Sequence, residues 1–327
     1  MKGSAGFAWT IARRRPFSVL VQVTNRCNMK CPFCDFWPNG APLQELTTDD
    51  FRRFASELAT VGTFLVSIEG GEPLVRPDLP EIVAAFARAG HLPVLYTNGW
   101  FVDEARAAAL SDAGVHQVGV SIDFPDAARH DAMRRTPGAF DRAVAAVERL
   151  EATIGARRVH LMTVLMRQNQ DDLEALLALS AGLGVRHQVT LLSDDGFRRG
   201  KLEEASRPDA RAMAVLPALA RRHRHLTSFS SYLDGMPRFL AGAELPRCRA
   251  GIQSFNVDHT GNVAACIETI DAPVGNVRDT PLAALLARLV ERDTGNGCQK
   301  CWTLCRGMAQ AMGEGGGARD WIDLTRM

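Results

Sequence analysis

The sequence predicts an α/β fold, a parallel sheet curved into a partial, TIM-like (β/α)6 barrel that is followed by a small cysteine-rich domain with a β-hairpin and a helix. Three observations support this prediction. Apolar runs typical of buried parallel strands alternate six times with amphipathic segments between Ser18 and Leu192. Glycines stand where the helices should end. The cysteines gather in two groups, and the first group directly follows the first apolar run.

The strands are predicted, in chain order, over residues 18–23, 63–68, 92–96, 117–122, 159–165 and 188–192. The helices between them are predicted over residues 48–59, 79–89, 103–112, 140–152 and 171–182, and Gly62, Gly90, Gly114 and Gly184 follow four of them. Repeated strand–helix alternation implies right-handed crossovers and a parallel sheet. Six units with a cysteine loop after the first strand favour an open barrel over a flat sheet.

A polar stretch with a glycine follows the sixth strand and marks the predicted end of the barrel. We expect a lead over residues 1–16, the barrel over 17–195, a helical connection over 196–240, the cysteine-rich domain over 241–310 and a glycine-rich tail over 311–327. One helix is predicted over 209–224. Two short β runs around Gly261-Asn262 predict a hairpin in the cysteine-rich domain.

Composition excludes several classes of protein. The 327 residues are 46% hydrophobic and 23% charged, which is ordinary for a globular protein with a real core. The net charge of +1 provides no basic field that would attract nucleic acid. No apolar stretch approaches the ~20 residues of a membrane span, and the run after Arg13-Arg14-Arg15 is too short for an export signal. We therefore expect a cytoplasmic protein.

The eight cysteines favour metal or redox chemistry over disulfides in such a protein. Cys27, Cys31 and Cys34 fall within eight residues, spaced x3 and then x2. Thiolates at this spacing can bind three corners of an iron–sulfur cube and leave the fourth iron open to a substrate or cofactor. The alternatives are a zinc knuckle with a distant fourth ligand, or three unrelated buried cysteines.

The second predicted strand runs into Gly70-Gly71-Glu72. The two glycines let the backbone approach a ligand closely. Glu72 places a negative charge at the carboxyl end of the strand, where active sites lie in parallel barrels. A tight turn would need similar residues, but one βα unit after a three-cysteine loop the motif becomes specific.

Together these motifs resemble the radical S-adenosylmethionine (SAM) superfamily over about residues 17–195. Phe33 occupies the aromatic position of that family's Cys-x3-Cys-x-aromatic-Cys motif. The resemblance implies a 4Fe–4S cluster held by Cys27, Cys31 and Cys34, with the amino and carboxylate groups of SAM chelating the open iron.

The resemblance also implies the residues that contact SAM. Gly70, Gly71 and Glu72 match the motif that holds the SAM ammonium, and Asn98 belongs to a Thr-Asn-Gly sequence found at that position in many members. Ser121 and Asp123 resemble the strand end that contacts the ribose, although they could equally cap a turn.

The reaction that the family shares is then implied. One electron, from a donor such as flavodoxin or ferredoxin, reduces the cluster, and SAM is cleaved to methionine and a 5′-deoxyadenosyl radical. The radical abstracts hydrogen from a substrate while the barrel orients the reactants and excludes water.

The five remaining cysteines resemble the SPASM/twitch extension of this superfamily. Cys248, Gly261 and Cys266 match its opening signature, and Cys298, Cys301 and Cys305 close it. A complete SPASM domain carries seven cysteines for two clusters, and two cubes need eight ligands. We therefore expect one auxiliary 4Fe–4S cluster, held by Cys248, Cys266 and two of the last three thiols. A structural zinc site is the alternative.

Three roles are open for the auxiliary cluster. It could accept the second electron of the substrate, which gives an oxidation or bond formation, or it could close the mouth of the barrel. It could also leave a spare thiol, Cys305 or another, to donate a hydrogen atom in an epimerisation. No other residue is assigned a catalytic role.

The sequence favours a small metabolite of the amino-sugar or cyclitol type as substrate. Only 26 residues precede Cys27, too few for a peptide-recognition domain. The first alternative is a maturase that modifies a ribosomally made peptide with a separate recognition protein. A second is an iron–sulfur electron-transfer or assembly protein that does not cleave SAM, although the Gly-Gly-Glu motif argues against it. Candidate pocket residues, none assigned as catalytic, are Trp37, Trp100, Phe124, Asp194 and Asp195.

Overall fold

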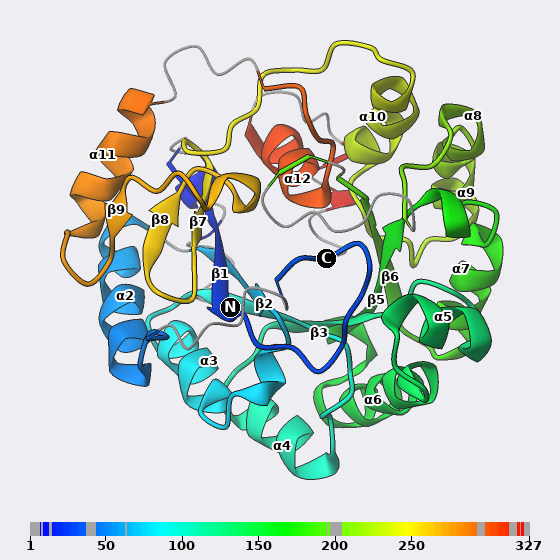
Figure 1. Ribbon diagram of the computed structural model, residues 1–327, viewed down its shortest axis with the longest axis horizontal. Helices are drawn as coiled ribbons and strands as arrows, with labels where there is room; N and C mark the ends of the chain where they lie inside the picture. Colours follow the sequence, from blue (N-terminus) through cyan, green and yellow to red (C-terminus); the bar gives the residue numbers. More distant parts are fainter. Residues whose placement is uncertain are drawn as a thin grey trace.

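A computed structural model describes residues 7, 9–12, 15–36, 44–62, 64–193, 195–196, 205–292, 298–313, 319–320 and 322–323. Six parallel strands follow one another in chain order across one sheet: β1 (Ser18–Thr24), β2 (Leu65–Gly70), β3 (Leu92–Thr97), β4 (Gln117–Ser121), β5 (Val159–Leu165) and β6 (Arg186–Leu191). The sheet curves into an open arc (Figure 1). The predicted α/β fold with a partial TIM-like barrel is confirmed.

Helices cover the outer face of the arc at every crossover (Figure 1): α2 (Thr48–Val61), α3 (Leu79–Arg88), α4 (Glu104–Asp112), α5 (Ala127–Arg134), α6 (Ala139–Ile154) and α7 (Leu173–Gly182). Short 3-10 turns accompany them: η1 (Pro73–Val75), η2 (Ala156–Arg158) and η3 (Arg167–Asn169). Helix α2 begins with a capping box, because the amide of Asp50 donates to Thr47 Oγ1 and the amide of Thr47 donates to Asp50 Oδ2. Three of the predicted glycines follow helix ends with positive φ: Gly90, Gly114 and Gly184.

Successive side chains along a strand alternate between two environments. Val19, Val21 and Val23 of β1 point outward into the main core between sheet and helices, where none of them is exposed. Ser18 and Leu20, on the opposite face of the same strand, line the lumen of the barrel. This period of two lets the outer face supply stability while the inner face remains available for chemistry.

The predicted hairpin exists, and it extends the barrel sheet. β7 (Ser254–Val257) pairs parallel with β1, and β8 (Asn262–Ala264) and β9 (Gly275–Asn276) continue antiparallel from it. The side-chain amides of Gln22 and Asn256 hydrogen-bond reciprocally across the β1–β7 junction. The segment boundaries stated above remain predictions.

The helix predicted over 209–224 is two helices, α8 (Ala210–Met213) and α9 (Leu216–Arg222). The break falls just before Pro217, which has no amide hydrogen to continue a helix and is tolerated in the first turn of a new one. The next elements with described bounds are α10 (Ser230–Leu240), η4 (Ile267–Thr269), α11 (Leu282–Arg292) and α12 (Leu304–Gly313).

Helix α12 lies on the open side of the strand arc, beside β6 (Figure 1). The amide of Leu304 donates to Thr190 Oγ1 at 3.1 Å, which joins the start of the helix to β6. Trp302 donates from Nε1 to the carbonyl of Tyr232 at 2.9 Å, which joins it to α10. The C-terminal cysteine segment is thereby attached to the barrel wall.

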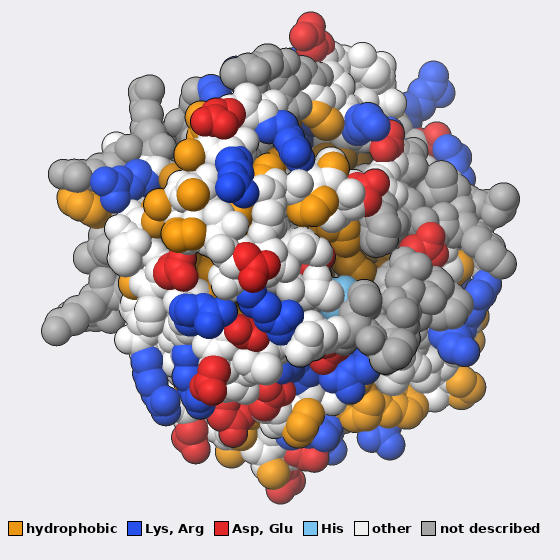
Figure 2. All heavy atoms as spheres, turned by 60° about the vertical axis from the view of Figure 1, so that its left-hand side comes forward, with side chains coloured by type: hydrophobic (Ala, Val, Ile, Leu, Met, Phe, Trp, Pro, Cys, Tyr) orange, Lys and Arg blue, Asp and Glu red, His pale blue; other side chains and the backbone are white. Residues whose placement is uncertain are grey.

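Within the described ranges, no helix has the length and apolar character needed to cross a membrane. Acidic and basic side chains are interspersed on the face shown in Figure 2. That face therefore has no field of one sign.

The Gln22–Asn256 pair gives a test of the β1–β7 junction. Asn256→Ala should lower the melting temperature by several degrees, because it leaves the buried amide of Gln22 without its partner, at a cost of about 1–3 kcal/mol. Differential scanning fluorimetry measures the change. The double variant Gln22→Met/Asn256→Leu should recover much of the loss, because no polar group then stays unpaired. An unchanged melting temperature in Asn256→Ala would contradict the role of this pair.

Candidate active site in the barrel lumen

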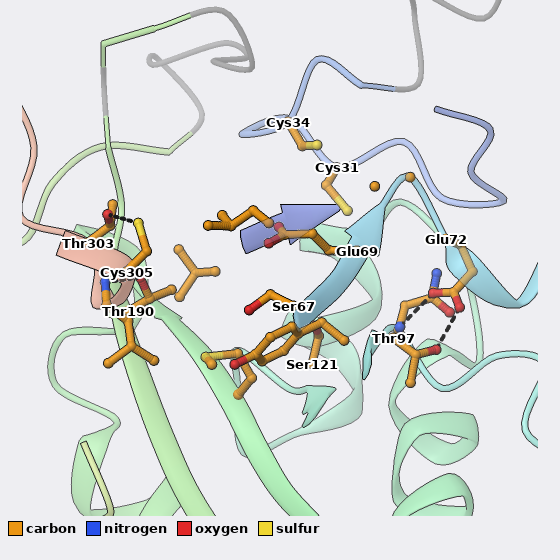
Figure 3. A pocket seen from close by; sticks show the side chains of 18 of the residues that line it. Cys31, Cys34, Ser67, Glu69, Glu72, Thr97, Ser121, Thr190, Thr303 and Cys305 are labelled. Carbon is orange, nitrogen blue, oxygen red and sulfur yellow. Dashed lines mark hydrogen bonds between the residues drawn. The ribbon is translucent and has the colours of Figure 1, made fainter. Parts of the chain in front are cut away.

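A cavity of about 280 Å³ lies inside the barrel at the carboxyl ends of the strands (Figure 3). Its walls come from the loop after β1, from the inward side chains of β1 to β6, and from the start of α12. In a parallel barrel this is the end at which catalytic residues gather.

The first cysteine group forms one wall of this cavity. Cys27, Cys31 and Cys34 all line it. The loop is ordered by a hydrogen bond from the amide of Cys34 to the carbonyl of Cys31 (3.2 Å), and the amide of Met29 donates to Cys27 Sγ (3.4 Å). Burial raises the pKa of the Cys27 thiol to about 12, so a metal is needed to hold this group as thiolate at neutral pH.

The donor set at this wall fits an iron–sulfur cube. As placed in the described ranges, no three His, Cys, Asp or Glu side chains lie at metal-binding distances. The fit therefore rests on chemistry: three sulfur donors, the ligands that such clusters take, face one space. A cube held by three thiolates keeps one iron open.

The Gly-Gly-Glu segment is clamped to the cysteine loop. The amide of Gly71 donates to the carbonyl of Thr24 (2.8 Å), and the amide of Glu72 donates to that of Arg26 (2.9 Å). A Cβ on Gly70 or Gly71 would collide with these same carbonyls. Approach to a ligand is therefore not needed to explain the two glycines, because their close approach to the chain's own backbone already requires them.

The Glu72 carboxylate joins β2 to β3. It is 1% exposed and accepts hydrogen bonds from Leu74 N (3.1 Å), Thr97 Oγ1 (2.7 Å) and Asn98 N (2.7 Å). Burial raises its pKa, and these donors oppose the rise. Asn98 also lines the cavity, and its Nδ2 donates to Asn28 Oδ1 (2.9 Å) in the cysteine loop.

Arg134, at the end of α5, was not singled out from the sequence. Its Nη2 donates to Asp123 Oδ2 at 2.5 Å, and its Nη1 lies 3.8 Å from Cys31 Sγ. Its guanidinium stacks on Phe33, with 5.5 Å to the ring centroid. Arg134 and Phe33 both line the cavity. No feature of the sequence separates Arg134 from the other arginines, because α5 itself was not predicted.

The two predicted ribose contacts are placed differently. Ser121 lines the cavity. Asp123 lies behind the wall with no exposed surface, and its Oδ1 accepts from Val164 N at 3.0 Å. The Asp123 carboxylate therefore connects β4, β5 and α5.

Further polar side chains line the lumen without having been predicted. Ser67 and Glu69 of β2 point into the cavity, whereas Glu72 is turned toward Thr97 (Figure 3). Tyr96 of β3 continues this wall, and Thr190 of β6 lines the opposite side of the cavity, beside Cys305 (Figure 3). Alternation along β2 was the signal that could have found Ser67 and Glu69.

Three of the five candidate pocket residues are described, and they lie away from this cavity. Trp37 and Asp194 lie outside the described residues. Trp100 carries the guanidinium of Arg142 over its ring, Phe124 carries that of Arg129, and Asp195 pairs with Lys300. None of these three lines the cavity within the part of the chain that is described.

The C-terminal cysteines converge from two segments. Gln299 and Leu245 exchange two hydrogen bonds (3.0 and 3.1 Å), and Arg306 donates to the carbonyls of Cys301 and Pro246. These contacts place the closing knuckle beside Cys248. Burial raises the pKa of the Cys248 thiol, and the charges of Cys301 and Cys298 add to the rise.

Cys266 belongs to the same group. Burial raises the pKa of its thiol, and so do the charges of Cys305 and Cys301. Cys305 differs from the other four, because it alone lines the cavity among the described C-terminal cysteines, opposite Cys31 and Cys34 (Figure 3). Its Sγ lies 3.1 Å from Thr303 Oγ1.

Comparison with known proteins gives a family match and several named relatives. The profile of the family described as "Radical SAM superfamily" matches residues 21–180. An AdoMet-dependent heme synthase of Methanosarcina barkeri is 34% identical over 59% of this chain and 55% of its own length. The mycofactocin maturase MftC of Mycolicibacterium smegmatis is 34% identical over 77% of this chain and 64% of its own length. The chain thus spans less than two thirds of the length of each of these two relatives. MftC of Mycobacterium ulcerans is 30% identical over 90% of this chain and 83% of its own length.

Solved structures share the fold at low sequence identity. The structure described as native anSMEcpe with bound AdoMet and Cp18Cys peptide superposes with a TM-score of 0.66 at 16% identity, covering 95% of both chains. Streptococcus suis SuiB bound to its precursor peptide SuiA superposes with a TM-score of 0.66 at 15% identity, covering 86% of this chain and 68% of SuiB. With the family match and the long alignment to MftC, this places the chain in the radical SAM superfamily, whose enzymes bind a 4Fe–4S cluster and SAM.

Proposed function

We propose that this enzyme uses SAM to abstract a hydrogen atom from a side chain of a ribosomally made peptide. The observation that carries the proposal is the lumenal cavity, which has three sulfur donors on one wall and the Cys305 thiol on the opposite wall. When bound, the cluster and SAM supply a 5′-deoxyadenosyl radical, after an external donor such as flavodoxin or ferredoxin has provided one electron.

The residues of the chain would bind and orient these groups. Cys27, Cys31 and Cys34 would hold the cluster, and the wall beside them would hold SAM. Glu72 Oε2 accepts one hydrogen bond within the described structure, so it retains a lone pair for an ammonium. Gly70, Gly71, Asn98, Ser121 and Phe33 complete this wall. Asp123 would act by positioning Arg134 beside Cys31.

A peptide substrate is supported by the names of the relatives. Besides the maturases, a PqqA peptide cyclase of Ruegeria pomeroyi is 32% identical over 68% of this chain and 60% of its own length. The peptide alternative is thus better supported than the small metabolite that the sequence favoured.

A small-molecule substrate remains the second candidate. Three of the relatives are named AdoMet-dependent heme synthase. The cavity volume argues against a ligand as large as a macrocycle lying wholly inside the lumen.

For the auxiliary cluster, we propose Cys248, Cys266, Cys298 and Cys301 as ligands. Contacts of the closing knuckle hold Cys301 beside Cys248. The charges of both Cys305 and Cys301 act on Cys266, so this effect does not separate the two thiols. We assign Cys305 as the thiol left over because, among the described C-terminal cysteines, its side chain alone lines the cavity. In that position it could exchange a hydrogen atom with a substrate radical.

The peptide assignment can be tested with any short peptides that are found encoded beside the gene. Anaerobically reconstituted enzyme is incubated with dithionite, SAM and each peptide, uniformly deuterated. We expect deuterium in 5′-deoxyadenosine and a changed peptide, with a loss of two hydrogens if the reaction is a two-electron oxidation. Mass spectrometry measures both. The variant Cys31→Ala should form no 5′-deoxyadenosine, since it lacks one cluster ligand.

The outcomes distinguish failure of the peptide assignment from failure of the radical chemistry. Formation of 5′-deoxyadenosine without label and with every peptide unchanged would reject the peptide substrate and keep the radical chemistry. No 5′-deoxyadenosine under any condition would reject the radical chemistry as well.

Iron analysis tests the ligand assignment. The reconstituted wild type should contain about eight irons per chain, from two four-iron cubes. Cys266→Ala should contain about four, because the auxiliary cluster loses a ligand, and Cys305→Ala should stay near eight. A loss of about four irons in Cys305→Ala would show that this thiol is a ligand and would overturn its assignment as the spare one.

A further inference from the structure

We infer that Arg134 raises the reduction potential of the cluster at the first cysteine group, because its guanidinium donates to the sulfur of Cys31, and that Asp123 limits this rise. The inference rests on the cluster that the family binds, and it does not depend on a peptide substrate. It is carried by the position of the guanidinium, by the burial of its ion pair, and by the turn that holds it.

The guanidinium of Arg134 connects one sulfur to one carboxylate. Its Nη1 lies 3.8 Å from Cys31 Sγ, and its Nη2 donates to Asp123 Oδ2 at 2.5 Å. A further hydrogen bond to this group of thiols, from the amide of Met29 to Cys27 Sγ, comes from an uncharged donor. Among the described residues that line the cavity, Arg134 is the only basic side chain. A positive charge is therefore placed beside one of the three cluster ligands.

Burial makes this charge effective. Arg134 is 7% exposed, and Asp123 has no exposed surface. Water screens a buried charge weakly, so the charge acts on its neighbours more strongly than it would at the surface. Burial raises the pKa of the Cys31 thiol; the charge of Arg134 opposes the rise, and that of Asp123 adds to it. The two members of the ion pair thus act on this sulfur with opposite signs.

His130, which also lies beside this pair, is not a second cation. Its ring is buried, and the amide of Asp123 donates to its Nδ1 at 3.2 Å. Burial and the charge of Arg134 lower the pKa of His130 to about 4, so the ring is neutral at pH 7. Of these two basic side chains, only Arg134 carries a charge to the cysteine wall.

The turn after α5 fixes the place of the guanidinium. The helix ends at Arg134, and Arg135 has a φ of 50°, the one positive φ at a non-glycine position within the described structure. The amides of Arg135 and Thr136 donate back to the carbonyls of Ala132 and Asp131. A left-handed residue with a side chain is strained, and such residues gather at functional sites where the surrounding structure holds them. The strained position here is next to the residue that reaches Cys31.

The direction of the expected effect follows from charge. Reduction adds one electron, so a cation that donates to a ligand sulfur stabilises the reduced cluster and raises its potential. The carboxylate of Asp123 opposes this effect, because its charge has the other sign. The potential must be high enough for an external donor to reduce the cluster, and low enough for the electron to pass on to SAM. The ion pair balances these two requirements.

A contact with SAM is a different role that Arg134 can have. Its Nη1 and Nη2 are used by Cys31 and Asp123, whereas its Nε has no partner within the described structure and is left for an acceptor on SAM. A contact of that kind would change the affinity for SAM and leave the potential of the SAM-free cluster as it is. Measuring the potential without SAM therefore separates the two roles.

Redox titration monitored by electron paramagnetic resonance tests the inference. Anaerobically reconstituted full chain is titrated without SAM, in the Cys248→Ala/Cys266→Ala background that should keep only this cluster, and again with both clusters present. Arg134→Gln should lower the midpoint potential by about 59 mV or more, which is a tenfold change in the equilibrium constant of a one-electron reduction. Arg134→Lys should lower it less, because the charge remains. Asp123→Asn should raise it, because the opposing charge is gone.

Matched variants separate the charge from the fold. Arg142 is an exposed residue of α6 whose guanidinium also stacks on an aromatic ring, 4.7 Å from the centroid of Trp100. Arg142→Gln should leave the potential unchanged. Arg134→Met/Asp123→Asn leaves no buried charge unpaired, so it serves where a single variant does not fold, and its potential should lie below that of the wild type. Circular dichroism and iron content show whether each variant is folded and loaded.

Two results would overturn the inference. The first is a potential in Arg134→Gln, or in the double variant, that equals or exceeds that of the wild type. The second is a potential in Asp123→Asn that equals or falls below it. If Arg134→Gln lowers only the affinity for SAM, titrated separately, the first result applies and Arg134 is a SAM contact alone. Because the titration contains neither SAM nor substrate, its result is independent of whether any peptide is modified.

Discussion

The contact between the Gly-Gly-Glu segment and the loop after β1 is the constraint on which the site depends. The backbone of Gly70 and Gly71 lies so close to the carbonyls of Thr24 and Arg26 that no side chain fits between them. Glu72 then fastens the same segment to β3 through three hydrogen bonds. The cysteine loop is therefore held against the ends of two strands, and its sulfur atoms face the lumen.

The two faces of the barrel sheet have different roles. Outward valines bury apolar area under the helices, and this burial stabilises the sheet without using the inner face. The inner face carries serines, Glu69, Tyr96 and Thr190. On the open side of the arc, α12 brings Cys305 to the same cavity as Cys31. One space thus lies between the two cysteine groups, which is what a reaction between a bound cofactor and an inserted side chain requires.

Local patterns in the sequence were enough to predict the strands of the barrel and the cysteines of the first group. The six strands were recognisable because their outward residues are apolar, and Cys27, Cys31 and Cys34 were recognisable by spacing. The pairing of β7 with β1 was not predictable, because it joins residues more than 200 positions apart and depends on register. Arg134 and Cys305 reach the cavity only through the placement of α5 and α12 in the fold, which local sequence patterns do not determine. The substrate expectation rested on the short segment before Cys27, which says little about chemistry, and the relatives favour a peptide instead.

The central claim is that three thiols of this loop hold an iron cube with one iron open to SAM. Electron paramagnetic resonance of the dithionite-reduced Cys248→Ala/Cys266→Ala variant, which should keep only this cluster, tests it most directly. We expect a reduced 4Fe–4S signal whose g values change when SAM is added, with coupling to nitrogen-15 when the amino group of SAM is labelled. A signal that SAM leaves unchanged, or zinc in place of iron, would contradict the claim.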